Sequence, residues 1–170
     1  MSPLTSSADE TVVYTALSVD EAKSRAMEWF TEQPHVTDEL RATVESLWQI
    51  DSQGTSVSER FDAAMQTFYL VDPSTRVMVD ACLDQPMPLY SQSFAALEAT
   101  GQGKFFENNV RFFYARYLAV GRSYEAALPL FEEIDPSELV DPAACLFYHA
   151  VCQHSLLLKE EGLDTIKLLL

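Results

Sequence analysis

The sequence predicts an all-α fold, arranged as an α-solenoid-like stack of antiparallel helix hairpins. Apolar residues recur at intervals of three and four positions along most of the chain, which is the spacing of one face of an α-helix. The 170 residues include only five glycines, and the breaks between apolar stripes carry prolines and helix-capping residues. A chain of this length accommodates one domain of about eight or nine short helices packed in pairs.

The net charge and the cysteine content narrow the classes of partner and the cellular location. Eleven basic and twenty-six acidic residues give a formal net charge of −15, which repels nucleic-acid phosphates and anionic lipid surfaces. We therefore expect neither nucleic acid nor a membrane as a partner. Cys82, Cys145 and Cys152 form an odd and widely spaced set, and no secretion signal precedes them, so a reducing cytoplasm is the expected location.

Residues 18–100 are predicted to form helix hairpins after an N-terminal tail of residues 1–17. Two capping-box pairs, Ser18 with Glu21 and Ser56 with Glu59, predict helices that begin at these serines. Prolines and other cap residues set the remaining boundaries: Pro34 ends the first helix, Thr37 begins the second, Asp72–Pro73 begins the fourth, and a break at 84–88 precedes a helix over 89–100.

Residues 101–170 are predicted to form helices over 104–120, 123–134 and 141–159. The first of these helices is rich in phenylalanine, and we expect the N-terminal helices to cover its aromatic side chains, because a single helical repeat cannot bury its own apolar face. The side chains in question are Phe105, Phe106, Phe112 and Phe113. The last five residues form an apolar helical pattern without a cap, which predicts that the region is truncated at Leu170.

Residues 108–170 resemble tetratricopeptide repeats in the order of their small, aromatic and turn residues. The matching residues are Ala115, Tyr124, Ala127, Phe131 and Asp135–Pro136. Ala150 follows Ala115 by thirty-five positions, close to the period of ~34 residues of such repeats. Leu118 and Pro129 depart from the pattern. Residues 18–100 lack the small-residue pattern, so they are interpreted as divergent repeats or as a separate helical cap.

The resemblance implies a non-enzymatic module for protein interaction or assembly, with no cofactor or metal and a protein or peptide as its partner. In this family, positions on the first helix of each hairpin line the concave groove. The corresponding residues here are Asn109, Phe112, Arg116, Phe147, Val151 and His154. Arg116 can pair with a carboxylate of the partner. The set of basic residues with which some members grip a terminal carboxylate is not reproduced, so binding of a C-terminal peptide is not expected.

Two alternative functions are also consistent with the sequence. Cys145, His149 and Cys152 are spaced i, i+4, i+7 along one predicted helix face, which would suit a metal- or redox-responsive protein. The favoured interpretation of these residues is packing inside a helix hairpin. The second alternative is a regulatory helical segment of a larger enzyme. The sequence contains no phosphate-binding glycine loop, nucleophile elbow or zinc-protease motif that would indicate an activity of its own.

Overall fold

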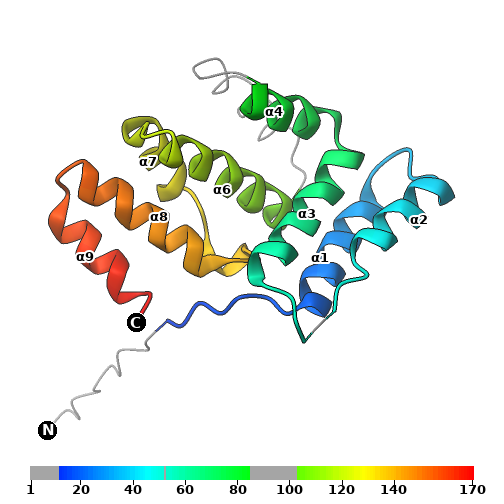
Figure 1. The fold of residues 1–170 in the computed structure, drawn as a ribbon, viewed down its shortest axis with the longest axis horizontal. Coiled ribbons are helices and arrows are strands. Elements are labelled where there is room, and N and C mark those ends of the chain that lie inside the picture. Colours follow the sequence, from blue (N-terminus) through cyan, green and yellow to red (C-terminus); the bar gives the residue numbers. More distant parts are fainter. Residues whose placement is uncertain (1–11, 52, 85–102) are drawn as a thin grey trace, which may run out of the picture.

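The computed structural model describes residues 12–51, 53–84 and 103–170. These residues form eight α-helices and one 3₁₀ turn, with no strand among them, so the predicted all-α class is confirmed for this part of the chain (Figure 1). The predicted helix over 89–100 lies outside the described residues. The elements are α1 (Val19–Glu32), α2 (Asp38–Leu47), α3 (Val57–Val71), α4 (Pro73–Asp84), α6 (Lys104–Val120), α7 (Tyr124–Glu132), η1 (Pro136–Glu138), α8 (Pro142–Ser155) and α9 (Lys159–Lys167).

Both predicted capping boxes are present at the starts of α1 and α3. The Ser18 hydroxyl accepts a hydrogen bond from the Glu21 amide at 3.1 Å, and the Glu21 carboxylate accepts one from the Ser18 amide at 3.1 Å. Ser56 and Glu59 make the same pair of bonds at the start of α3. Because each box satisfies two backbone donors that have no partner within the helix, these starts are fixed by local sequence.

One apolar core joins the N-terminal helices to α6. The indole of Trp29 in α1 stacks on the ring of Phe106 with centroids 4.9 Å apart, and Phe68 of α3 meets the same ring edge-on. Further along α6, Phe112 packs on Phe61 of α3. The rings of Phe105, Phe106 and Phe112 are buried, so the predicted cover by the N-terminal helices is confirmed for these three residues.

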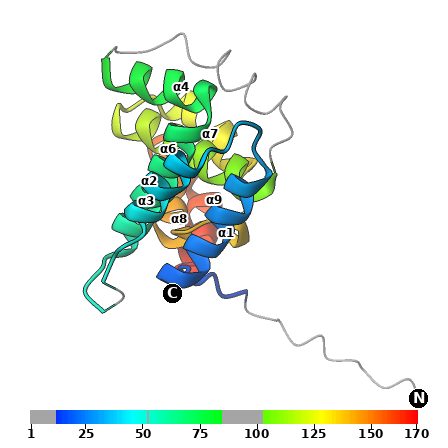
Figure 2. The same ribbon diagram turned by 90° about the vertical axis from the view of Figure 1, so that its right-hand side faces the viewer.

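Polar contacts tie the first described residues to the connection between α7 and α8. The Leu17 amide donates to the Val140 carbonyl at 3.1 Å, and the Arg60 guanidinium donates to the Leu17 carbonyl at 2.8 Å. Arg25 of α1 forms a part-buried ion pair with Glu138 of η1. These contacts bring residues far apart in sequence together, and Figures 1 and 2 show α1 and the α7–α8 connection on neighbouring parts of the molecule.

The pairs α6–α7 and α8–α9 repeat the same turn thirty-five residues apart. Arg122 and Leu157 both have a left-handed backbone, with φ of 62° and 63°. In each turn the amide of the next residue bonds back over the turn at 2.8 Å, from Ser123 to Leu118 and from Leu158 to Gln153. The helices that follow, α7 and α9, each have nine residues. The two hairpins therefore share one backbone design.

The predicted helix over 141–159 is too long, because α8 ends at Ser155. The left-handed Leu157 reverses the chain, and α9 begins at Lys159 as a separate helix. Three consecutive leucines, 156–158, occupy this turn, and leucine is a strong helix former that gives no turn signal. The packing of α9 against α8 is a tertiary interaction that local sequence does not encode.

Candidate interaction surface

The six predicted groove residues do not form one exposed surface. Asn109 and Phe112 are fully buried, so both are corrected from contact residues to core residues. The Asn109 amide donates to the carbonyls of Phe105 and Glu138 at 2.7 and 3.1 Å, and its oxygen accepts from the Val140 amide at 3.1 Å. Asn109 thus holds the segment between α7 and α8 against α6, because it satisfies buried backbone groups there.

Arg116 is half-buried and lies over aromatic rings. Its guanidinium carbon is 5.1, 5.6 and 5.8 Å from the ring centroids of Phe61, Phe112 and Phe113. Such distances are typical of cation–π contacts, which favour a fixed guanidinium. The guanidinium of Arg116 is thus engaged by one ring of α3 and two rings of its own helix.

Phe147, Val151 and His154 follow one side of α8. Phe147 is 54% exposed and its ring meets Tyr148 edge-on; Val151 is half-buried and His154 is exposed. His154 also lines a groove of about 250 Å³ between α8 and α9. The predicted contact residues of α8 therefore lie on or next to a recess that is mostly apolar.

This α8–α9 groove has an apolar wall on each helix. Its lining residues are Ala150, His154, Leu158, Lys159, Gly162, Leu163 and Ile166. Leu163 and Ile166 are 58% and 41% exposed. A Cβ atom at Gly162 would stand 3.6 Å from the Gln153 side chain, an ordinary van der Waals contact, so α8 and α9 pack closely at this position. Gln153 accepts a buried hydrogen bond from the Thr165 hydroxyl at 2.7 Å, which fixes α9 on α8.

Cys145, His149 and Cys152 face the protein interior. Both thiols are buried, and burial raises the pKa of Cys152 to about 11 and that of Cys145 well above the usual range. The His149 ring stacks on Phe131 of α7 with centroids 5.6 Å apart. Within the described residues, no three His, Cys, Asp or Glu side chains are placed to hold a metal ion. The arrangement matches helix packing rather than a metal or thiolate site.

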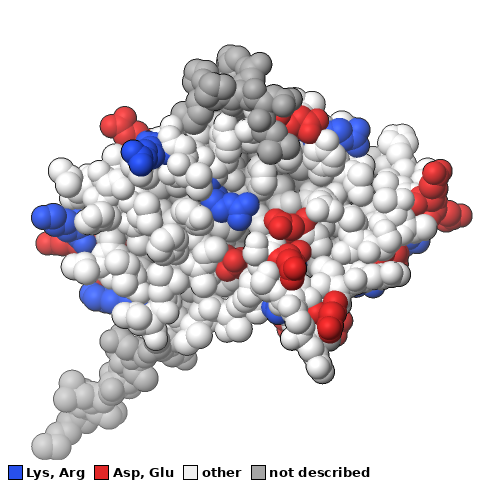
Figure 3. Space-filling view, viewed as in Figure 1, with Lys and Arg blue, Asp and Glu red and all other residues white. Residues whose placement is uncertain are grey.

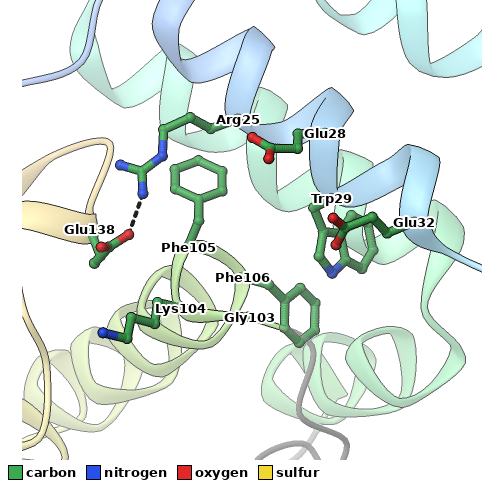
Figure 4. Close-up of a pocket in the computed structure, with 9 residues that line it drawn as sticks. All are labelled: Arg25, Glu28, Trp29, Glu32, Gly103, Lys104, Phe105, Phe106 and Glu138. Carbon is green, nitrogen blue, oxygen red and sulfur yellow. Dashed lines mark hydrogen bonds and ion pairs between the residues drawn. The ribbon is translucent and has the colours of Figure 1, made fainter.

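Sequence reasoning missed a second recess, of about 260 Å³, where α1 meets the start of α6 (Figure 4). Aromatic rings and charged groups of both signs line it: Arg25, Glu28, Trp29, Glu32, Gly103, Lys104, Phe105, Phe106 and Glu138. Arg25 lies over the Phe105 ring at 4.7 Å and pairs with Glu138. In Figure 3 a basic side chain lies near the middle of the face, with acidic side chains around it. Only the fold brings these distant segments together, so no sequence motif marks the recess.

Comparisons of the chain with protein-family models, curated proteins and solved structures found no match. In the described part of the chain, none of the helices is both long and apolar enough to span a membrane.

Proposed function

We propose that the chain is a non-enzymatic module for protein interaction or assembly, and that α6–α7 and α8–α9 are tetratricopeptide-like hairpins. The thirty-five-residue recurrence of the turn supports the second part of this proposal, because it lies close to the period of ~34 residues of such repeats. Small residues at equivalent positions add support. Ala115 and Ala150 are buried in α6 and α8, and Ala127 and Gly162 are buried in α7 and α9.

The main support for a binding function is that the α8–α9 hairpin exposes apolar side chains at positions that are buried in the α6–α7 hairpin. Phe131 is 2% exposed in α7, whereas Ile166, its counterpart in α9, is 41% exposed. Ile134 is 7% exposed after α7, whereas its counterpart Leu169 is 36% exposed. Apolar side chains that are left uncovered in a contiguous recess are typical of a surface that binds another protein.

The proposed contact surface consists of the α8–α9 groove with Phe147 and Val151 beside it. His154 lines the groove and is also one of the contact residues predicted from the sequence. Phe147 offers an exposed aromatic ring, and aromatic residues often contribute most of the binding energy in an interface. Arg116 is not included in this surface because its guanidinium already lies over the rings of Phe61, Phe112 and Phe113. The buried thiols of α8 have raised pKa values, so they are poor nucleophiles, which is in keeping with a binding function.

The test compares proteins recovered from an extract of the source cells by the wild-type chain and by two variants. Leu163→Asp places a carboxylate in the groove, and we expect recovery of the specific partner to fall by about tenfold or more. Val77→Asp is the matched control, because Val77 is 62% exposed and lies on α4, which does not contact α8 or α9. Recovery is measured by quantitative mass spectrometry.

Far-ultraviolet circular dichroism checks that both variants keep the helical content of the wild type. Because Leu163 and Val77 are both mostly exposed, neither substitution removes a core side chain, and we expect both variants to fold. If the variants recover the same proteins in the same amounts as the wild type, the α8–α9 groove is not the contact surface.

A further inference from the structure

The first hairpin shows how a helix occupies a groove of this kind, because α8 packs against both α6 and α7. The side of α8 that faces them carries Cys145, His149 and Cys152, spaced i, i+4, i+7 along one helix face. The His149 ring lies nearly parallel to Phe131 of α7 at 5.6 Å, and the two thiols are buried in the core that also contains Ala115. The helix that fills the first groove is thus α8. The side that it inserts has the small residues Cys145 and Cys152 on either side of the His149 ring.

The second groove has the same backbone form as the first. The turn bonds, the left-handed residue and the length of the second helix all recur at a spacing of thirty-five residues. The groove walls correspond as well: Ala115 to Ala150, Ala127 to Gly162, Leu128 to Leu163 and Phe131 to Ile166. Ile166 therefore has the position in the second groove that Phe131 has in the first, where Phe131 contacts the His149 ring. In the described structure no helix covers Ile166, which is 41% exposed.

We propose that the α8–α9 groove accepts a basic amphipathic helix from a partner protein, seated as α8 is seated on α6 and α7. This inference rests on the proposed function and specifies the partner's chemistry. The inserted ridge has small or apolar residues at i, i+4 and i+7, and its central residue packs on Ile166. Docking of an amphipathic helix in an apolar groove is a recurrent mode of protein recognition.

Charge favours a basic partner over a second copy of the chain. Each copy carries a formal net charge of −15, so two copies repel one another, whereas a basic partner is attracted. The groove lining itself has one charged side chain, Lys159, and no carboxylate; beside the lining, α9 carries Glu160, Glu161 and Asp164 against Lys167. Lys167 is already paired with Asp164 at 3.0 Å. The exposed carboxylates of Glu160 and Glu161, outside the lining, are therefore the groups that can pair with lysine or arginine on the outer face of the bound helix.

The probe is a synthetic, fluorescently labelled peptide of residues 141–158, which is the chain's own groove-filling helix. Three positions that are exposed on α8 are made basic by Ala143→Lys, His154→Lys and Ser155→Lys. A matched acidic peptide carries glutamate at the same three positions. A ridge control adds His149→Asp to the basic peptide. Binding to the complete chain is followed by fluorescence anisotropy under reducing conditions.

We expect the basic peptide to bind the wild-type chain, and Ile166→Asp in the chain to weaken that binding by about tenfold or more. Val77→Asp should leave the affinity within about twofold of the wild type, because surface changes remote from the groove act weakly. The ridge control should lose binding by a similar factor to Ile166→Asp. The acidic peptide should bind more weakly than the basic one at low salt, with the difference shrinking as salt is added.

Three results would overturn the inference. Absence of binding by the basic peptide excludes a helix of this type, and equal binding to wild type and Ile166→Asp places the peptide elsewhere. A chain that dimerises by light scattering, and that becomes monomeric with Ile166→Asp, identifies a second copy as the occupant. If the peptide fails but Leu163→Asp still loses a cellular partner, the proposed function stands and only the helical, basic character of the partner is wrong.

Discussion

At the scale of single residues, His149 links core packing to pH. Burial lowers the pKa of His149 below its ordinary value, and Glu132 opposes this shift. Its Nε2 is buried without a hydrogen-bond partner, and its ring stacks on Phe131. The folded chain therefore binds a proton at this site less readily than the unfolded chain. Stability that depends on neutral His149 is present above the unfolded pKa and is lost as the pH falls below it.

We predict that the free energy of unfolding of the wild type decreases as the pH is lowered from 7 to 5. His149→Phe keeps an aromatic ring against Phe131 but cannot be protonated, so its free energy of unfolding should depend less on pH over the same range. Urea unfolding at several pH values measures both slopes. Equal slopes for the two proteins would show that His149 does not contribute to the pH dependence.

Residues of the same type differ in burial in ways that the sequence pattern could not predict. Phe112 and Phe147 occupy equivalent positions in α6 and α8, yet Phe112 is fully buried and Phe147 is 54% exposed. The difference arises because Phe61 of α3 packs on Phe112, which is a contact between distant parts of the chain. Asn109 likewise had the polarity of a contact residue, but its hydrogen bonds to the α7–α8 connection make it structural.

At the scale of elements, the turn between α8 and α9 includes a backbone conformation that is unfavourable for its residue, Leu157. Leu157 adopts φ of 63° and is 77% exposed, so its side chain makes few contacts that offset the left-handed backbone. Glycine adopts this conformation without a steric penalty. We predict that Leu157→Gly raises the free energy of unfolding by about 0.5–1 kcal/mol, the balance between relieved strain and the greater entropy of an unfolded glycine.

Leu157→Val is the matched variant, because a β-branched side chain is still less compatible with a left-handed backbone and should lower the free energy of unfolding. Both variants are measured by urea unfolding. A stabilising effect of Leu157→Val, or a loss of stability with Leu157→Gly, would contradict the backbone geometry assigned to the turn.

Helix starts were more predictable than helix ends. Ser18, Thr37, Ser56 and Asp141 each cap a helix with a side-chain oxygen that accepts from the backbone, and such caps are written in a few adjacent residues. The end of α8 has no such signal, because the residues of its turn are leucines. The recurrence of the α6–α7 turn at Leu157 was the available clue, since Arg122 lies thirty-five positions earlier.

At the scale of the whole molecule, the described N-terminal and C-terminal helices share one core. Trp29 stacks on Phe106, Leu17 bonds to Val140, and Arg25 pairs with Glu138. The sequence predicted that the N-terminal helices cover α6, because the exposed aromatics of a lone repeat require cover. It could not predict the recess between Trp29 and Lys104 (Figure 4), since that recess depends on the relative placement of distant helices.

The same reasoning explains why the α8–α9 groove was only partly predictable. His154 and Phe147 were named from their positions on one helix, whereas Leu163 and Ile166 were not, because no cap or turn residue marks where α9 begins. Periodicity places residues on a helix face, but the second wall of a groove comes from another element. The proposed interaction surface therefore joins one predicted helix face to one that only the structure provides.

Amide hydrogen exchange, measured by mass spectrometry on the complete chain alone and bound to a partner whose recovery Leu163→Asp reduces, shows whether that partner covers the α8–α9 groove. We expect binding to slow exchange in α8 and α9, with the largest change over residues 159–169 and little change in α2 and α4. Slowed exchange confined to α1–α4, with α8 and α9 unchanged, would contradict the claim that the partner occupies the α8–α9 groove.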